Sequence, residues 1–545
     1  MTISKKKYII VTGGVISGLG KGVASASIGL LLSDNYRIVP IKMDGYLNVD
    51  PGTMNPIEHG EVFVLDDGGE VDMDFGHYER FMNANPTKAQ SITMGKIYDE
   101  IREKERRGDY LGKTVQLIPH VTDLIQEKVL EIGEKQDGDI VMVEIGGTIG
   151  DIENDLFVEA MRQLKSKVGR ENICYVHLTY VPIPYGVKEQ KTKPTQQSVD
   201  LLRKKGVFPD FILARCSERL AESSKKKIAL FADLPEENVL SAPDVSSVYK
   251  IPSSFEEQKF LERICEKLNL SLPTKQRFKI WEKLLETPKD KTVFITIAGK
   301  YTDLEDSYAS IIESLKHCEY NLGVKIEINW IETSSAINYS ILEESDGIIV
   351  PGGFGTRGVE GKIEVIRFAR ENKIPYLGIC YGMQLAIIEF ARHVCGIDNA
   401  TSMEVEKNAE QPVITLLDEQ QKVVNMGGTM RLGAYTAKLT DGQIKDLYAK
   451  FSLFEEDKEG NFCVSERHRH RFEVNPNFTK DIEKKGLNIV GRSYERNLVE
   501  FIELPKEKHP YFVGTQAHPE LKSKLEKPAP LFYGLIKAAI KKSKK

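Results

Sequence analysis

Residues 8–22 read YIIVTGGVISGLGKG and decide the fold of the first half of the chain. The apolar run 8–11 predicts a strand, and 23–32 after the glycines has the composition of a helix. Backbone N–H groups in such a loop, together with the positive end of the next helix, bind phosphate oxygens. Lys21 would add a mobile positive charge for the outer phosphates. The stretch therefore predicts a phosphate-binding α/β domain.

The loop departs from the strict P-loop motif at two positions. Val15 stands where the motif has glycine, and Gly22 stands where it has Ser or Thr. Without that hydroxyl, Mg²⁺ needs carboxylate oxygens from elsewhere, and Asp74 and Glu144 are the candidates. Glu144 follows the apolar strand 139–143, where parallel strands present ligand-binding groups. The loop alone leaves a glycine-rich turn without a ligand as the alternative.

The bulk composition indicates a globular protein of two or three domains. The chain has 545 residues and a formal net charge of -5, so it has no overall attraction to nucleic acid or an anionic membrane. No apolar run is long enough to span a bilayer, and we expect a cytoplasmic protein. Seven scattered cysteines without a C-x-x-C pair argue against a disulfide framework or a thiolate zinc site.

A second group of basic residues lies farther along the first half. The run 36–44 predicts a buried strand, and Lys42 near its end is a further candidate for a nucleotide phosphate. Lysines also crowd the start of a helix predicted at 199–205, and Lys227 could join them. The residues at that start are Lys191, Lys193, Pro194 and Gln196. A solvated basic loop is the alternative, whereas two phosphate sites would suggest two nucleotides or a nucleotide and an anionic substrate.

The composition becomes charged around one amphipathic helix at 278–285, and a new strand begins at 292. We therefore expect a first domain over 1–270, a linker over 271–290 and a second domain over 291–545. The second domain again alternates strand and helix patterns, which is typical of α/β folds.

The second domain contains the sequence IPYLGICYGMQL at 374–385. A strand that turns into a helix at Cys380, between two glycines, is the pattern of a nucleophile elbow. A helix N-terminus stabilises a thiolate and offers N–H donors to an oxyanion. His518 and Glu520 follow a later apolar strand and suit a general base and its orienting acid. A buried cysteine in a tight turn is the alternative.

Two neighbouring segments complete this prediction. The glycine-rich run PGGFG at 351–355 can add oxyanion N–H groups. The run RHRHR at 467–471 is too basic for a general base, and we interpret it as a carboxylate-binding segment.

The motifs PGGFG, GICYGMQ at 378–384 and QAHPE at 516–520 resemble the class I glutamine amidotransferases. The resemblance implies that Cys380 is the nucleophile that forms a glutamyl thioester, that His518 is the base and that Glu520 orients it. It also implies a set of glutamine-binding residues. These are Gly353, Phe354, Gln384, Glu404 and Arg471.

The first half resembles the CTP synthase family through VTGGVISGLGKG at 11–22, NVDPGTMNPIEHGEVFV at 48–64, GHYERF at 76–81, VEIGGTIGDIE at 143–153 and KTKPTQ at 191–196. With the second half, the resemblance extends from Tyr8 to about Tyr533. Tyr381 stands where many members have Leu, and Phe472 where Tyr is frequent. Neither residue supplies the nucleophile or the base.

The resemblance implies an α/β fold in two parts. The N-terminal part would be a P-loop-like, dethiobiotin-synthetase-like synthetase domain with a parallel sheet, and the C-terminal part an α/β class I glutamine amidotransferase domain. The implied reaction has two steps: ATP phosphorylates O4 of UTP, and ammonia from glutamine then attacks C4, which releases phosphate and CTP.

The resemblance also assigns residues to the nucleotides. ATP and its phosphates would contact Ser17, Gly18, Leu19, Gly20, Lys21, Gly22 and Lys42, with Mg²⁺ on Asp74 and Glu144. UTP, or CTP as feedback inhibitor, would contact Ser17, Asp151, Ile152, Glu153, Lys191, Thr192, Lys193, Pro194, Thr195, Gln196 and Lys227, and Glu159 would also take part in CTP binding.

Regulation and assembly follow from the resemblance alone. GTP is expected to activate glutamine hydrolysis, with Leu111 and Arg357 nearby, and the segment 55–62 with His59 would line an ammonia passage. A homotetramer without nucleic acid or membrane partners is expected. The alternatives are a cobyrinate-type glutamine-dependent amidase and a catalytically inactive, filament-forming relative.

Overall fold

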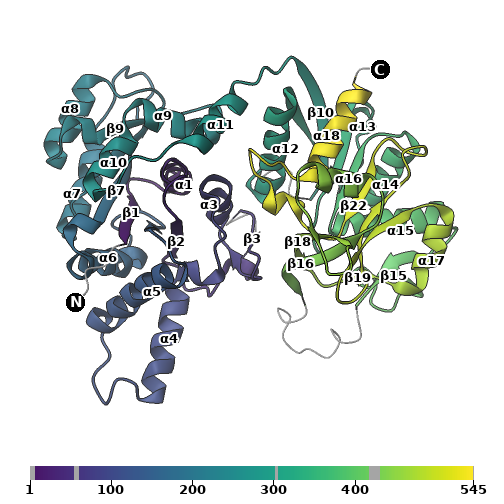
Figure 1. Ribbon diagram of the computed structural model, residues 1–545, viewed down its shortest axis with the longest axis horizontal. Coiled ribbons are helices and arrows are strands. Elements are labelled where there is room, and N and C mark those ends of the chain that lie inside the picture. Colours follow the sequence, from purple (N-terminus) through teal and green to yellow (C-terminus); the bar gives the residue numbers. More distant parts are fainter. Residues whose placement is uncertain (1–5, 55–59, 301–304, 417–429, 544–545) are drawn as a thin grey trace. The chain divides into compact units, whose positions relative to one another are not determined.

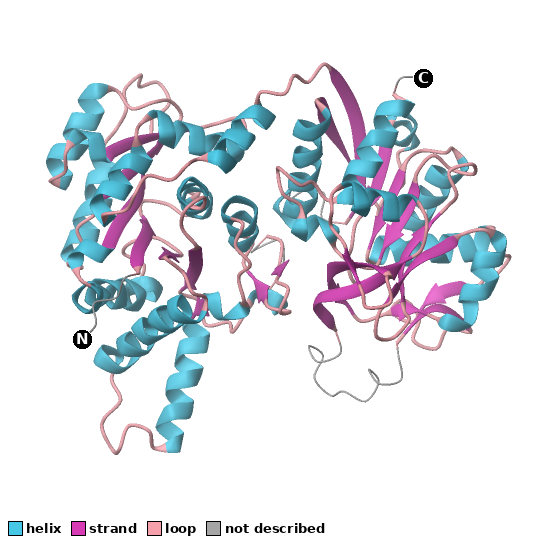
Figure 2. Cartoon of the chain, in the orientation of Figure 1, coloured by secondary structure: helices cyan, strands magenta, loops and turns pink. Residues whose placement is uncertain are grey.

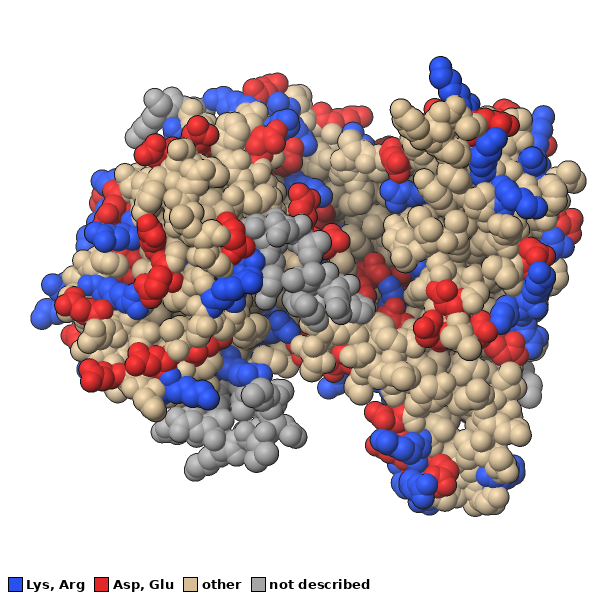
Figure 3. Space-filling model, turned by 180° about the vertical axis from the view of Figure 1, so that it is seen from behind, with Lys and Arg blue, Asp and Glu red and all other residues tan. Residues whose placement is uncertain are grey.

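The computed structural model describes residues 6–54, 60–300, 305–416 and 430–543 (Figure 1). The chain forms two compact units. The first comprises residues 1–53 and 71–285, and the second comprises residues 54–70 and 286–545. Figure 2 shows that both units combine helices with a central sheet, as the sequence predicts. On the face shown in Figure 3, Lys and Arg side chains are interspersed with Asp and Glu, rather than gathered by sign.

The first unit is built on a seven-stranded sheet in the order β5-β2-β6-β1-β7-β8-β9. All neighbouring strands run parallel. The strands are β1 (Lys7–Gly13), β2 (Ile38–Asp44), β5 (Ser91–Thr93), β6 (Ile140–Ile145), β7 (Ile173–Tyr180), β8 (Phe211–Cys216) and β9 (Val239–Pro243). They are apolar and buried almost throughout, because helices cover both faces of a parallel sheet. The short strands β3 (Phe63–Val64) and β4 (Glu70–Val71) form a separate pair.

The helices of the first unit are α1 (Lys21–Leu32), α3 (Asp74–Met82), α4 (Met94–Arg107), α5 (Thr122–Lys135), α6 (Asp155–Val168), α7 (Lys193–Lys204), α8 (Glu222–Ala232), α9 (Ile251–Glu257), α10 (Phe260–Leu268) and α11 (Gln276–Leu285). Helices α5 and α6 share one core cluster with Tyr8 and Ile10 of β1. The first turn of α1 begins directly behind the glycine-rich loop, and α1 packs against α3. Gly29 leaves room there for Met82, since an added Cβ would lie 2.5 Å from Met82 Cγ.

The helix expected within the linker packs on the first unit. Trp281 of α11 is fully buried and lies edge-on to Phe81 and Tyr249, with ring centroids 4.8 Å and 5.3 Å away. Aromatic pairs of this kind stabilise beyond their buried area. Helix α11 is therefore a structural part of the first unit and not an open connection.

The second unit contains a ten-stranded sheet in the order β11-β10-β12-β13-β22-β21-β20-β16-β18-β17. The strands from β11 to β22 are parallel, and those from β21 onward are antiparallel. Their bounds are β10 (Lys291–Gly299), β11 (Val324–Glu332), β12 (Gly347–Val350), β13 (Tyr376–Ile379), β16 (Arg431–Leu439), β17 (Glu455–Glu456), β18 (Phe462–His470), β20 (Asn488–Ser493), β21 (Val499–Glu503) and β22 (Phe512–Thr515).

A smaller three-stranded sheet joins β14 (Ala400–Ser402), β15 (Gln411–Thr415) and β19 (Glu473–Val474). The helices are α12 (Ala309–Leu322), α13 (Tyr339–Glu344), α14 (Val359–Glu371), α15 (Tyr381–His393), α16 (Gln443–Lys450), α17 (Pro476–Lys485) and α18 (Pro530–Lys542). None of the helices in the described part of the chain has both the length and the apolar composition needed to cross a bilayer.

The pairing of β13 with β22 explains how distant residues meet. Gly378 lies opposite Gly514, and Ile379 lies opposite Thr515, in parallel register. Both strands therefore end at the same edge of the sheet. Cys380 directly follows β13, and His518 comes three residues after β22, so this register closes the long sequence separation between them.

Candidate active sites

The glycine-rich loop lies at the carboxyl end of β1 and opens directly into α1. Gly18 and Gly20 have φ values of 72° and 87°, a region that side chains rarely adopt. Val15 also has a positive φ, 81°, at the position where the strict motif has glycine. The predicted strand, loop and helix are thus confirmed, and α1 begins at Lys21.

Gly22 has a specific structural reason for being glycine. A Cβ at this position would lie 1.9 Å from Asp74 Oδ1. The carboxylate of Asp74 therefore approaches the start of α1 at the position where the strict P-loop motif has its hydroxyl. A Ser or Thr at position 22 would collide with Asp74, so the missing hydroxyl and the nearby carboxylate have the same structural cause. Sequence reasoning connected the two residues only because Mg²⁺ would need another ligand.

Lys21 and Lys42 lie together among buried carboxylates at this edge of the sheet. Lys21 Nζ donates to the carbonyl of Gly147 at 2.6 Å. Burial lowers the pKa of Lys21, and the carboxylate of Glu144 partly offsets that effect. Lys42 Nζ donates to Asp74 and, at 3.2 Å, to Glu144 Oε1. Burial alone would lower the pKa of Lys42, but Asp74 and Glu144 hold it well above its usual value.

Two residues of this cluster were not predicted as site residues. Asp44, the last residue of β2, lies 3.9 Å from Lys42 Nζ, and burial raises the pKa of Asp44 to about 7 against the opposing charge of Lys42. Tyr78 of α3 donates its hydroxyl hydrogen to Glu144. Asp44 could have been found as the residue ending a predicted strand, and Tyr78 lies inside the motif GHYERF.

The carboxylates fit a magnesium ion that shares its shell with phosphates. Asp74 and Glu144 both bind the same ammonium group, so their oxygens converge on one position. Asp44 Oδ2 is buried and has no hydrogen-bond partner in the described residues. Within that part of the chain, no three His, Cys, Asp or Glu residues are arranged to hold a metal alone. Mg²⁺ usually takes one or two carboxylates and completes its shell with phosphates and water, which suits this pair.

A small apolar pocket of about 110 Å³ adjoins the outer side of the loop, and sequence reasoning missed it. Arg215 Nη1 donates to the carbonyl of Leu19 at 3.1 Å and forms one wall. Most of the other lining side chains are apolar, among them Val23, Ala24, Val245, Val248, Ile251 and Phe255. A small, mostly apolar pocket beside a phosphate loop has the chemistry of a site for a nucleotide base.

The residues predicted for the pyrimidine nucleotide lie on the glycine-rich loop, on the turn after β6, on the segment that leads into α7, on α7 itself and on α8 (Glu222–Ala232). Lys193 is the first residue of α7, and Pro194 occupies its first turn, as predicted. Asp151 lies on the turn after β6 and accepts from the Thr148 N–H at 3.0 Å. Lys191 pairs with Glu189 at 2.6 Å, and the charge of Lys227 also acts on Glu189. The two lysines are thus brought near each other, while Ile152 and Glu153 are exposed beside Asp151.

Other predicted members of this group make internal contacts. Thr195 is buried and donates to the carbonyl of Tyr180 at 2.9 Å, and Gln196 donates to Thr192 Oγ1 at 3.0 Å. Ser17 and Gly18 are exposed at the tip of the glycine-rich loop. The role of this set in UTP or CTP binding stays a prediction.

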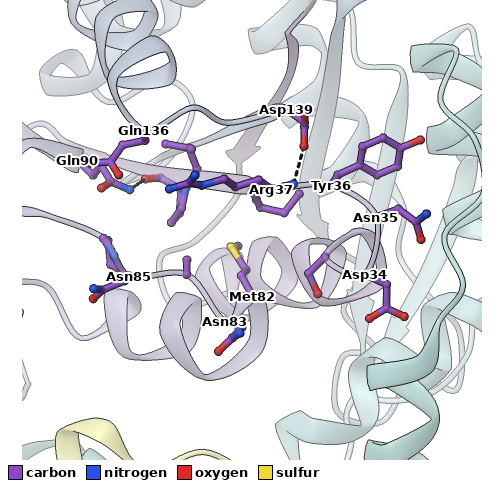
Figure 4. Close-up of a pocket in the computed structure, with 16 residues that line it drawn as sticks. Asp34, Asn35, Tyr36, Arg37, Met82, Asn83, Asn85, Gln90, Gln136 and Asp139 are labelled. Carbon is purple, nitrogen blue, oxygen red and sulfur yellow. Dashed lines mark hydrogen bonds between the residues drawn. The ribbon is translucent and has the colours of Figure 1, made fainter. Parts of the chain in front are cut away.

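A larger polar cavity of about 570 Å³ lies elsewhere in the first unit (Figure 4). It is lined by the turn before β2, by the residues that follow α3 and by Asp139, whose Oδ2 accepts from the Arg37 N–H at 2.8 Å. These segments lie at the amino ends of β2 and β6, opposite the edge that carries Lys21. Ligands of parallel sheets bind at the carboxyl edge, so this cavity lies away from the predicted chemistry.

In the second unit, Cys380 lies at a strained turn between β13 and α15. Its φ and ψ are 52° and -103°, and its N–H donates to the Thr515 carbonyl at 2.7 Å. A Cβ at Gly382 would lie 2.0 Å from the Val350 carbonyl oxygen, and one at Gly378 would lie 2.6 Å from the Tyr376 hydroxyl. Only glycine fits at these two positions, which is the geometry of a nucleophile elbow.

His518 and Glu520 lie beside this turn. His518 Nδ1 and Glu520 Oε1 are 2.7 Å apart, and Nε2 is buried without a hydrogen-bond partner in the described residues. A Cβ at Gly352 would lie 2.9 Å from His518 Cε1 and 3.5 Å from Cys380 Cβ, so the glycine-rich run at 351–355 contacts both side chains. Burial would lower the pKa of His518, but Glu520 and Cys380 hold it well above its usual value.

The residues predicted to bind glutamine surround the same position. Glu404 Oε1 accepts from the Gly355 N–H at 2.6 Å, and burial raises the pKa of Glu404. Gln384 Nε2 donates to the Phe472 carbonyl at 2.9 Å. Arg471 Nε is buried without a hydrogen-bond partner in the described residues, and Phe354 is partly exposed. Gln516, which was not predicted, places Nε2 at 3.7 Å from Cys380 Sγ.

The basic segment 467–471 binds carboxylates of this chain. Arg467 Nε donates to Asp66 at 2.6 Å, and Arg469 Nε donates to Glu70 at 2.8 Å. Both acids belong to the segment 54–70, which these contacts tie to the second unit. Burial and the charge of Arg431 lower the pKa of His468 and of His470 well below the usual value, so both imidazoles are neutral.

Sequence reasoning missed a buried ion cluster next to this segment. Arg431 donates to Glu473 at 3.1 Å and to Glu500 at 2.8 Å. Burial raises the pKa of Glu473 to about 8 and that of Glu500 to about 7, although Arg431 opposes both shifts. The three residues come from β16, β19 and β21, so no local pattern in the sequence connects them.

The remaining predicted residues are less informative. His59 and its neighbours at 55–58 lie outside the described residues, while Glu61 accepts from the Ser310 N–H at 3.0 Å. Arg357 donates to the Lys300 carbonyl at 2.9 Å. Leu111 is exposed, with 88% of its surface accessible, on the loop after α4.

Comparisons with known proteins match the two halves of the chain to two family models. The family model described as CTP synthase N-terminus matches residues 7–270, and that described as class-I glutamine amidotransferase matches residues 303–538. A CTP synthase from Borreliella afzelii is 51% identical over 542 residues, which cover 98% of this chain and 99% of the relative. A CTP synthase from Pyrococcus furiosus is 50% identical over 539 residues, or 98% of both chains.

Among solved structures, the glutaminase domain of a Trypanosoma brucei CTPS with bound acivicin matches at 34% identity and a TM-score of 0.41. The match covers 46% of this chain and 94% of that one. The full-length similarity to curated relatives, together with a phosphate-loop sheet and a Cys-His-Glu arrangement on one chain, shows that this chain belongs to the CTP synthase family.

Proposed function

We propose that the chain aminates UTP in two steps at two separate centres, through a 4-phosphorylated UTP intermediate. As a family member, it is a glutamine-dependent ligase that converts UTP to CTP with ATP. The observation that carries the assignment of residues is the strained Cys380 beside the His518–Glu520 pair. Family membership favours this reaction over the cobyrinate-type amidase.

In the first step, O4 of UTP attacks the γ-phosphorus of ATP, and ADP leaves. Lys21 and Lys42 neutralise the negative charge on the phosphoryl oxygens while the phosphoryl group moves from ATP to UTP. Lys42 already binds Asp74 and Glu144, so phosphate binding would draw its ammonium group away from those acids. Mg²⁺, held by the freed carboxylates, would supply charge neutralisation to the phosphates when bound. The pocket beside Arg215 suits the adenine base of ATP.

In the second centre, the Cys380 thiolate attacks the amide carbon of glutamine. The tetrahedral oxyanion would accept hydrogen bonds from backbone N–H groups of the run at 351–355 and of the start of α15. His518 then protonates the departing ammonia, with Glu520 fixing its ring orientation. Water, deprotonated by His518, hydrolyses the glutamyl thioester and releases glutamate. The ammonia attacks C4 of phosphorylated UTP, which releases phosphate and CTP.

The regulators and the assembly belong to the same proposal. GTP activates glutamine hydrolysis, and CTP inhibits by occupying the triphosphate site around Lys191, Lys193 and Lys227. A cytoplasmic homotetramer is the assembly that we propose. Leu111 is exposed, and Arg357 lies on the loop before α14 with its side chain on the Lys300 carbonyl, so both positions suit ligand contacts.

One substitution tests the division of labour. Cys380→Ala should abolish glutamine-dependent CTP formation and leave ammonia-dependent formation nearly unchanged, because only the ammonia source is removed. CTP is measured by its absorbance with each nitrogen donor in turn. Equal loss with both donors would refute the assignment of Cys380 to glutamine hydrolysis alone.

A further inference from the structure

Lys362 of α14 is a buried cation that the proposed mechanism does not use. Its side chain is almost fully buried, and Nζ has no hydrogen-bond partner in the described residues. A Cβ at Gly353 would lie 3.7 Å from this Nζ, so the ammonium group lies directly behind the glycine-rich run at 351–355. Nζ is also 5.4 Å from the ring centroid of Tyr381, which follows Cys380.

An unpaired ammonium group in this position is costly. Moving a charge out of water without a partner usually shifts its pKa until the group becomes neutral. Burial, together with the nearby charge of Lys300, lowers the pKa of Lys362 to about 7. Negative charge on Cys380, Glu332 and Glu404 acts in the opposite direction. Lys362 is therefore poised to gain or lose its proton near neutral pH.

The charged groups around Lys362 come from several elements. Lys300 follows β10 and donates to the Phe354 carbonyl, while Glu332 ends β11. Glu404 follows β14 and is already bound by the Gly355 N–H. Cys380 is the only one of these groups on which the proposed reaction creates and removes negative charge. The electrostatic partner that Lys362 lacks at rest would thus be strongest during glutamine hydrolysis.

We infer that Lys362 is a positioning residue for glutamine hydrolysis, whose positive charge stabilises the Cys380 thiolate and the oxyanion formed from the amide. The inference rests on the proposed role of Cys380. Lys362 Nζ makes no hydrogen bond to the Cys380 sulfur. It acts electrostatically through the glycine-rich run, which lies between Nζ and the two reacting side chains. Buried charges interact strongly even without direct contact, because little water screens them.

The test is the pH dependence of glutamine hydrolysis in two variants. Lys362→Met keeps the length of the side chain and removes the charge, and it should lower kcat about tenfold at low pH, or about 1.4 kcal/mol of transition-state stabilisation. The wild-type advantage should shrink as pH rises through about 7, where Lys362 loses its own proton. Lys362→Arg keeps a charge at every pH, so it should retain the wild-type rate and extend it to higher pH.

The matched control is Arg367→Met, which removes an exposed positive charge from the same helix. It should leave the pH profile unchanged. A second readout is the rate at which iodoacetamide alkylates Cys380: in Lys362→Met, a higher pH should be needed to reach half of the maximal rate. Ammonia-dependent CTP formation should be unaffected.

Three outcomes would overturn the inference. They are a wild-type rate in Lys362→Met at all pH values, a loss by the same factor at every pH, and an Arg variant that behaves like the Met variant. Failure of the proposed function would look different, because Cys380→Ala would then retain glutamine hydrolysis.

Discussion

The two units place their reactive groups at the same position in the fold, the carboxyl edge of parallel strands, but prepare them in different ways. Around Lys42, opposite charges compensate one another before any ligand binds. Around Cys380, the backbone itself is strained, and the glycines at 378 and 382 leave no room for side chains. The first centre is held by ion pairs between side chains, whereas the second is held by its backbone.

This difference predicts which substitutions each centre tolerates. Charged side chains can move, so the first centre should be sensitive to loss of a charge and adaptable to small steric changes. A strained turn cannot move without losing its geometry. The predictions below test that contrast, beginning with the largest expected effect.

Removing the loop lysine should cause the largest loss. Lys21→Ala should reduce CTP formation about 10³-fold with either nitrogen donor, because positive charge at the transferring phosphate is lost. Glutamine hydrolysis, measured as glutamate release, should survive at least in part. Lys135→Ala, an exposed lysine at the end of α5, serves as the control. Full ammonia-dependent activity in the Lys21 variant would contradict the role of the loop.

Adding one methyl group at the elbow should be almost as damaging to the second centre. Gly382→Ala places its Cβ against the Val350 carbonyl, and we expect glutamine hydrolysis to fall about 10²-fold because a small displacement of Cys380 disrupts its geometry. CTP formation from added ammonia should persist. If the variant hydrolyses glutamine normally, the turn is less rigid than its backbone geometry indicates.

Restoring the P-loop hydroxyl should lower activity and not raise it. In Gly22→Ser, the new Cβ would meet Asp74 Oδ1, so the carboxylate must move away from Lys42 and Glu144. Ammonia-dependent kcat should fall about tenfold, a smaller loss than at the elbow because a flexible side chain can adjust. Gly22→Ala separates the effect of the methyl group from that of the hydroxyl. A Gly22→Ser variant that is faster than wild type would contradict this prediction. It would show that the added hydroxyl helps to bind the metal and that Asp74 can move without loss of activity.

The smallest effect concerns stability and pH. Because burial raises the pKa of Glu473 to about 8, the folded state holds this proton more tightly than the unfolded state does. The resulting stabilisation is fully present below the ordinary pKa of Glu and is lost as pH rises through about 8. Wild type should lose unfolding free energy between about pH 6 and pH 9, and Glu473→Gln should lose less.

Urea unfolding of the second unit measures this difference. The chain has two tryptophans, so Trp281→Phe leaves the fluorescence of Trp330 in β11 as its reporter. Glu483→Gln, on the exposed side of α17, controls for the loss of one carboxylate. The same pH dependence in wild type and Glu473→Gln would show that Arg431 compensates the buried carboxylate fully.

Much of the molecule follows from local sequence. Strand, loop and helix around Lys21 were predictable because apolar runs bounded by glycines have few alternative conformations. The turn at Cys380 was predictable for the same reason, and His518 and Glu520 were predictable as a base and its orienting acid because they follow a later apolar strand.

Tertiary structure alone decided which distant groups share a charge or a space. No spacing in the sequence links Tyr78 to Glu144, or Arg431 to Glu473 and Glu500, because these residues come close together only when separate elements pack against one another. The same holds for Lys362, which appears in the sequence as an ordinary helix lysine. Burial and unpaired charge are properties of the packed chain, so local patterns determined the reactive residues and only the fold determined the electrostatics around them.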